Sequence, residues 1–207
     1  MCSISWTNSR SLGNTPDRML TAVVPMKSME LAKTRLSSVL DGARRHALVR
    51  QMLDHVLATL REAGLDGVHV ASADDGTGDL NTDVTDAARR VQEEGARELL
   101  LVMADLPYLA VSDIAAMIEA GRTSDIVIAE AKDGGTNALL LRPPTVLKFA
   151  FTTGRPSAQF HADHARNVGI APAIVRRPGL ARDIDTPDDL KSLVSDHPAY
   201  RVFRHVA

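Results

Sequence analysis

Cysteine is almost missing from this sequence: Cys2 is the only one in 207 residues, so no disulfide can form within the chain. Aromatic residues make up only 3% of it, which argues against the stacking platforms that bind single-stranded nucleic acids. A formal net charge of −2 lacks the basic excess typical of nucleic-acid binders. These absences predict a protein of a reducing, cytoplasmic compartment that does not bind nucleic acid.

Long apolar runs are also absent. The longest, such as residues 99–104, have the length of a strand and not of a membrane span, so we expect no membrane association. Residues 1–17 lack the apolar core of a secretory signal. We predict a disordered extension at residues 1–18 and a single domain at residues 19–207, because 44% hydrophobic residues suffice for one core.

The chain does contain alternating strand and helix patterns. Apolar runs predict strands at residues 20–24, 67–71, 98–103, 125–131, 138–141 and 173–176. Helical spacing of apolar residues predicts helices at 43–63, 82–94, 112–120 and 156–168, and a last helix that opens at 186–189. The tail from residue 197 shows no clear pattern. The alternation predicts an α/β fold with a mostly parallel sheet and helices on both faces. Ligands bind such sheets beyond the carboxyl ends of the strands.

Cationic residues follow the first predicted strand, at Lys27, Lys33 and Arg35. There they could bind the oxygens of a triphosphate and neutralise the charge that builds up on leaving pyrophosphate. The alternative is a solvated basic loop, which is the ordinary setting of lysine and arginine. The Walker motif GxxxxGK[ST] does not occur, so any triphosphate site is of another type.

Three acidic residues are candidate ligands for a magnesium ion. Asp105 follows the apolar run at 98–103, where a carboxylate is costly unless it meets a cation or several donors. Magnesium bound to nucleotide phosphates suits that position, and the alternative is a turn or cap residue. Asp183 and Asp185 alternate on an extended segment and therefore point the same way. Thr186 already caps the next helix, so capping does not explain the two acids.

Two segments predict a second phosphate site beside the nucleotide. Residues 133–137, DGGTN, contain two glycines whose N–H groups could form an anion-binding nest, with Thr136 adjacent. Gly154 and Ser157 lie at the predicted start of a helix, where phosphate often binds. Further along that helix, His161 and His164 could bind zinc, but no third ligand is evident and ordinary helix histidines are commoner.

These motifs, in this order, resemble the guanylyltransferases of the coenzyme F420 pathway. The resemblance rests on AVVPMK at 22–27, AKTRL at 32–36, MADLP at 103–107, GGTNALLLRPP at 134–144, RPGL at 177–180 and DIDTP at 183–187. It covers roughly residues 20–194. The GGTNALLLRPP stretch is its most specific part, whereas DIDTPDDL is shared with wider nucleotidyltransferases, including molybdenum-cofactor enzymes.

The resemblance implies a Rossmann-like nucleotidyltransferase fold and transfer of GMP from GTP to the phosphate of a three-carbon acid, with release of pyrophosphate. The acid would be 2-phospho-L-lactate, phosphoenolpyruvate or 3-phospho-D-glycerate, and a homodimer is an expectation from the family. The implied site residues fall into four groups: Asp105, Asp183 and Asp185 as Mg²⁺ ligands; Thr136, Gly154 and Ser157 on the phospho-acid; Lys27, Lys33 and Arg35 on the triphosphate; Asn81 near the nucleotide.

Two features depart from the family pattern. The segment between Val70 and Asn81 is shorter, and the FTTG at 151–154 lacks a glycine directly after the aromatic residue. Two alternatives therefore stay open beside the phospho-acid guanylyltransferase. One is a nucleotidyltransferase for another phosphorylated acceptor, of the molybdenum-cofactor type. The other is a non-catalytic GTP-binding protein.

Overall fold

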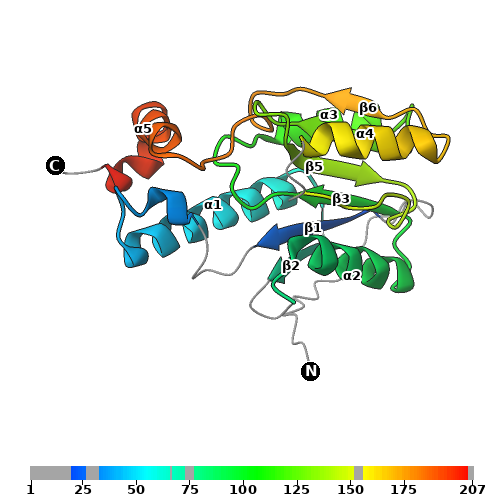
Figure 1. The fold of residues 1–207 in the computed structure, drawn as a ribbon, viewed down its shortest axis with the longest axis horizontal. Coiled ribbons are helices and arrows are strands. Elements are labelled where there is room, and N and C mark those ends of the chain that lie inside the picture. The colour runs from blue at the N-terminus through cyan, green and yellow to red at the C-terminus, as the bar shows by residue number, and fades with distance from the viewer. Residues whose placement is uncertain (1–19, 27–32, 66, 73–76, 152–155, 205–207) are drawn as a thin grey trace.

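A six-stranded sheet forms the centre of the protein (Figure 1). The computed structural model describes residues 20–26, 33–65, 67–72, 77–151 and 156–204, so the expected extension at 1–18 lies outside it. The strand order is β2-β1-β3-β5-β4-β6. The strands are β1 (Leu20–Met26), β2 (Val68–Ser72), β3 (Glu98–Val102), β4 (Ile126–Glu130), β5 (Thr136–Leu141) and β6 (Ala173–Val175).

The sheet is mostly parallel, as predicted, with one antiparallel strand inside it. β1 runs parallel to β2 and β3, and β4 runs parallel to β6, whereas β5 is antiparallel to both of its neighbours. Residues 131–135 between β4 and β5 are too few for a crossover connection, so the two strands form a hairpin. As a result β5 begins at the sheet edge where β3 ends, and the Met103 N–H donates to the Asn137 carbonyl at 2.9 Å.

Helices cover both faces of the sheet because successive strand residues point to opposite sides. Leu100 and Val102 of β3 pack in a core with α1 (Gly42–Glu62) and α3 (Val111–Ala120). Leu99 and Leu101 pack on the other face with α2 (Leu80–Glu93) and α4 (Ser157–Asn167). All of β3 is buried, as its unbroken apolar run predicted. Burial of each such leucine side chain contributes about 1.5–3 kcal/mol.

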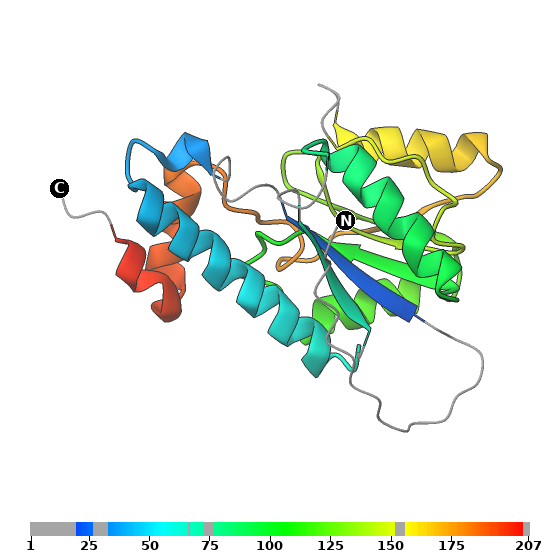
Figure 2. The same ribbon diagram turned by 90° about the horizontal axis from the view of Figure 1, so that it is seen from below.

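A third apolar cluster lies on the first half of α1, where that helix extends beyond the sheet toward the C-terminal helices (Figure 2). It joins α1 to α5 (Pro187–Asp196) and to two 3₁₀ helices, η1 (Thr34–Leu36) and η2 (Pro198–Phe203). The sequence indicated no element after residue 197, yet Tyr200 and Phe203 are buried here. Their spacing of three matches a 3₁₀ turn, which is too short to give a periodic signal. We call this cluster, with its helices, the C-terminal subregion.

Helix starts follow the local signals in the sequence. Asp41 accepts a hydrogen bond from the Arg44 N–H at the start of α1, and Thr186 and Asp189 form a capping box at the start of α5. The structure confirms the predicted cap at Thr186. None of the described helices is both long and apolar enough to span a membrane.

Candidate active site

A cavity of about 410 Å³ opens between the sheet and the C-terminal subregion. It lies where β1 and β3 end and β5 begins, the edge that the α/β rule predicts for a ligand. The residues that line it from the sheet are Pro25, Met26 and Met103. The polar side chains that line it are those of Lys33, Asp105, Thr136, Ser157, Asp183 and Asp185. The cavity therefore brings together residues that are far apart in the sequence.

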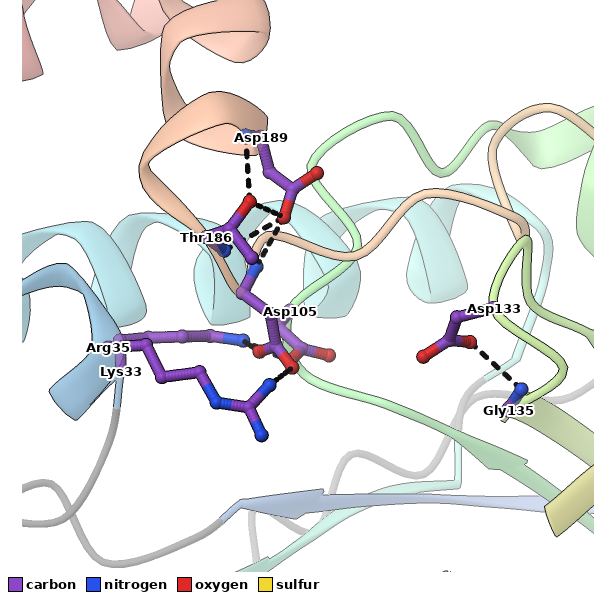
Figure 3. A network of polar contacts seen from close by, with 8 residues as sticks. Lys33, Arg35, Asp105, Asp133, Gly135, Thr186 and Asp189 are labelled. Carbon is purple, nitrogen blue, oxygen red and sulfur yellow. Dashed lines mark hydrogen bonds and ion pairs between the residues drawn. The ribbon is translucent and has the colours of Figure 1, made fainter. Parts of the chain in front are cut away.

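Lys33 connects two of the three candidate metal ligands, Asp105 and Asp185, and Figure 3 shows its side chain next to Asp105. Its ammonium lies 2.5 Å from Asp105 Oδ2 and 2.7 Å from Asp185 Oδ1. Burial by itself would lower the pKa of Lys33, but the two carboxylates outweigh burial and raise that pKa above its ordinary value. Lys33 also has a φ of 55°, a left-handed conformation that is uncommon outside glycine. Such strain persists where the surroundings enforce it, often at functional sites.

Asp105, Asp183 and Asp185 form an acidic trio: one oxygen of each lies within 4.8 Å of the others. Burial raises the pKa of Asp183 to about 6, and the charges of Asp105 and Asp185 add to the shift. The raised pKa means that the ionised form of Asp183 is disfavoured beside the two other carboxylates. A divalent cation fits this set of oxygen ligands, and its charge would favour the ionised form. Among the described residues this trio is the only group of three or more His, Cys, Asp or Glu side chains close enough together to hold a metal ion, and His161 and His164 are not part of it.

Three contacts fasten the loop that carries Asp183 and Asp185. The Asn137 amide donates to the Leu180 carbonyl at 2.9 Å, the Lys132 N–H donates to the Ala181 carbonyl at 3.0 Å, and Arg177 pairs with buried Asp113 at 3.0 Å. Gly179 packs so tightly that a Cβ there would lie 2.0 Å from the Asp113 carboxylate. The sequence predicts for Asn137 only a place in a ligand-binding turn. Its role as a loop anchor has no local sequence signal.

The glycine turn at 133–137 does not form the expected nest. The Gly134 N–H donates to the Ala131 carbonyl at 3.0 Å, and the Gly135 N–H donates to Asp133 Oδ1 at 2.9 Å. Both groups are therefore used inside the turn and are not available to an anion. The prediction of a nest was wrong because spacing alone does not show which N–H groups the hairpin itself consumes.

Two hydroxyl groups line the cavity next to the turn. Ser157 Oγ lies 3.1 Å from Thr136 Oγ1, and Nδ1 of His161 lies 2.9 Å from the same oxygen. Thr136 and Ser157 are both buried and belong to β5 and α4. The antiparallel direction of β5 places Thr136 here, opposite the first residue of α4.

The remaining predicted residues are placed as follows. Arg35 is exposed and lies 3.6 Å from Asp185. The side-chain oxygen of Asn81 accepts a hydrogen bond from the Phe151 N–H at 2.8 Å, and Phe151, unlike Asn81, lines the cavity. Asn81 thus supports the cavity wall. Lys27 and Gly154 lie outside the described residues.

Solved structures share this fold. A structure described as a nucleotide-diphospho-sugar transferase, from Desulfovibrio desulfuricans G20, matches with a TM-score of 0.72 at 18% identity, over 89% of this chain and 90% of that chain. A 4-diphosphocytidyl-2C-methyl-D-erythritol synthase matches with a TM-score of 0.57 at 16% identity, over 86% of this chain and 98% of that chain. These likenesses confirm the predicted Rossmann-like nucleotidyltransferase fold.

Sequence relatives narrow the class to one family. The family model described as guanylyl transferase CofC like matches residues 20–201. The phosphoenolpyruvate guanylyltransferase of Rubrobacter xylanophilus is 39% identical over 83% of this chain and 92% of that protein. The 2-phospho-L-lactate guanylyltransferase of Methanothermobacter thermautotrophicus is 29% identical over 84% of this chain and 83% of that protein. The chain belongs to the CofC-like guanylyl transferase family, as the resemblance predicted, and is a nucleotidyltransferase.

Proposed function

We propose that this protein transfers GMP from GTP to the phosphate of a three-carbon phospho-acid and releases pyrophosphate, as a step of coenzyme F420 biosynthesis. The observation that carries the proposal is the acidic trio with Lys33, in the cavity of a chain that belongs to the CofC-like family. The same family match disfavours a molybdenum-cofactor acceptor.

Among the three phospho-acids, we propose phosphoenolpyruvate as the acceptor substrate. The relative at 39% identity carries phosphoenolpyruvate in its name, whereas the relative named for 2-phospho-L-lactate is 29% identical. The acid would lie against Thr136 and Ser157, with Gly154 nearby. GTP would lie toward Lys27, Lys33 and Arg35, with Asn81 supporting the nucleotide side through Phe151.

Asp105, Asp183 and Asp185 would hold Mg²⁺, since three carboxylate oxygens so close together suit a hard cation, whose charge would favour the ionised form of Asp183. Magnesium bound there would supply positive charge to the phosphates of GTP. Lys33 and Arg35 would add charge toward the leaving pyrophosphate. In the reaction, an oxygen of the acid's phosphate forms a bond to the α-phosphorus of GTP while the bond to pyrophosphate breaks. No general base is needed because the attacking phosphate is already anionic, so alignment and charge neutralisation carry catalysis.

A cytoplasmic location and a homodimer belong to the same proposal. The lone cysteine of the chain supports a reducing compartment, and the homodimer follows from the family resemblance alone. Size-exclusion chromatography with light scattering would measure the oligomeric state directly.

The first test measures pyrophosphate release from GTP and Mg²⁺ with each of the three phospho-acids in separate reactions. We expect release with phosphoenolpyruvate, little release when ATP or CTP replaces GTP, and none after chelation of the metal. GTP binding without release for any acid would contradict the proposal and favour a non-catalytic GTP-binding protein.

A matched pair of variants tests the metal assignment. Asp183→Asn removes one charge from the trio, whereas Asp188→Asn removes an exposed charge outside the residues that line the cavity. We expect Asp183→Asn to weaken Mg²⁺ binding in a calorimetric titration and to reduce turnover at least 100-fold, a loss of about 2.7 kcal/mol. Asp188→Asn should behave like the wild type. Equal Mg²⁺ affinity in the two variants would remove the trio from the metal site.

A further inference from the structure

His161 is a buried side chain on α4 that the proposed chemistry does not use. Its side chain is fully buried, yet both ring nitrogens have hydrogen-bonding partners. Nε2 lies 3.1 Å from the backbone nitrogen of Ala150, and Nδ1 lies 2.9 Å from Thr136 Oγ1. The ring therefore connects the chain segment before residue 151 to a hydroxyl group of the cavity.

These two contacts determine the tautomer of His161. The Ala150 N–H can only donate, so Nε2 must accept and carries no hydrogen. Burial lowers the pKa of His161 to about 4, and the charge of His164 acts in the same direction. The ring is thus neutral at physiological pH, and its single hydrogen resides on Nδ1. His161 consequently donates a hydrogen bond to Thr136 Oγ1.

The direction of that hydrogen bond matters for the cavity. Thr136 and Ser157 together have two hydroxyl hydrogens, and one of them lies in the 3.1 Å bond between the two oxygens. Because His161 donates, it consumes neither of these hydrogens. One hydroxyl hydrogen is left to point into the cavity that both residues line. With the opposite tautomer, Nδ1 would accept that hydrogen and the pair would offer no donor to a ligand.

We propose that His161 is a positioning residue, which holds the Thr136–Ser157 pair so that one hydroxyl donates to an anionic oxygen of the phosphorylated acceptor. The inference rests on the proposed function and assigns to this wall of the cavity the acid, not the nucleotide. A hydrogen bond to a charged oxygen is stronger than one to a neutral group. Because the acid and not GTP lies against this wall in the proposed function, loss of the hydroxyl donor should weaken binding of the acid and leave GTP binding unchanged.

Two substitutions separate the ring nitrogens. In His161→Gln the amide can reach the Nε2 position and accept from Ala150, but the donor to Thr136 is lost. In His161→Asn the amide can reach the Nδ1 position and donate to Thr136. We expect the KM for phosphoenolpyruvate to rise about tenfold in His161→Gln, as for loss of one hydrogen bond to a charged group, with the KM for GTP unchanged. His161→Asn should recover most of the affinity for the acid.

Thr136→Val provides the matching control. It should raise the KM for the acid in the same way, and adding His161→Gln to it should cause little further change, because both substitutions remove one interaction. If His161 only supports the fold, the Gln and Asn variants will lose stability alike and leave the KM for the acid unchanged. That result, in folded protein, would overturn the proposal.

A measurement on the wild-type protein tests the tautomer without any turnover. Long-range ¹H–¹⁵N correlation spectra of histidine-labelled protein report which ring nitrogen carries the hydrogen, and the His161→Asn spectrum identifies the signals among the 7 histidines. We expect a protonated Nδ1 and an unprotonated Nε2 at pH 7, and a hydrogen on Nε2 would overturn the proposal. If the wild type transfers GMP to no acid, the proposed function fails, while calorimetric binding of phosphoenolpyruvate to the wild type and His161→Gln still decides this inference.

Discussion

Replacement of Lys33 by Met tests whether the acidic trio is held together by a single cation. Met has a similar length and no charge, so the substitution keeps most of the packing and removes only the ammonium. The variant loses the contacts of 2.5 and 2.7 Å to Asp105 and Asp185. Three carboxylates then face one cavity, and Arg35, an exposed side chain, remains 3.6 Å from Asp185.

The expected loss of stability depends on how deeply the ion pairs of Lys33 with Asp105 and Asp185 are buried. Removal of one partner from a fully buried ion pair costs about 3–5 kcal/mol. The Lys33 side chain is only 8% exposed, whereas the side chains of Asp105 and Asp185 are 29% and 45% exposed. Water therefore screens part of the repulsion, and we expect a loss of about 2–3 kcal/mol in the free energy of unfolding at pH 7.

Urea unfolding of Lys33→Met, the wild type and the exposed-lysine control Lys148→Met, with and without Mg²⁺, would measure this loss. Mg²⁺ should stabilise Lys33→Met more than the wild type, because the metal replaces the missing charge and binds the folded state. Acidification toward pH 5 should also reduce the difference in unfolding free energy between Lys33→Met and the wild type. Lys33 lowers the pKa of Asp183, so without Lys33 that pKa should rise further above its unfolded value, and the folded state then takes up more protons as the pH falls. Wild-type stability in the variant without metal, or an equal Mg²⁺ effect in both proteins, would refute the reasoning.

Three other substitutions give predictions of known sign. Asn137→Ala should lower the free energy of unfolding by about 1–3 kcal/mol, since it leaves the buried Leu180 carbonyl unpaired. It should also lower the affinity for Mg²⁺, and a titration that finds this affinity unchanged would show that the loop does not position the metal site. Gly179→Ala should lower the free energy of unfolding by about 1–3 kcal/mol through overpacking. In the control Gly67→Ala the new Cβ meets only ordinary contacts of 3.7 Å or more, and thermal unfolding of the two variants would compare their losses of stability. The folded-state pKa of His161, about 4, lies below its unfolded value, so its contribution to stability is complete above pH 6.5 and falls by about 3 kcal/mol as the pH drops to 4. The stability advantage of the wild type over His161→Asn, measured by urea unfolding from pH 7 to 4.5, should shrink accordingly, and a constant advantage would contradict a buried neutral ring.

The sequence by itself determined the strands, the α-helices and the family, but not the two 3₁₀ helices. Apolar periodicity depends on local geometry, so the unbroken run at 98–103 predicted the buried β3 and the leucine spacing at 43–63 predicted α1. The Thr186 cap involves residues three apart and was equally readable. Motif order along the chain indicated the guanylyltransferase family, which the family match over residues 20–201 confirms.

Only the tertiary structure decided how those residues meet. The antiparallel direction of β5 follows from a short hairpin connection, and it brings Thr136 to the edge where β3 ends. Lys33 and Asp185 are 152 positions apart, yet they form an ion pair, and no local pattern contains that distance. The same holds for Asn137, whose amide anchors a loop 43 residues away. Local patterns specify what each segment can become, whereas the site depends on long-range packing that places the segments against one another.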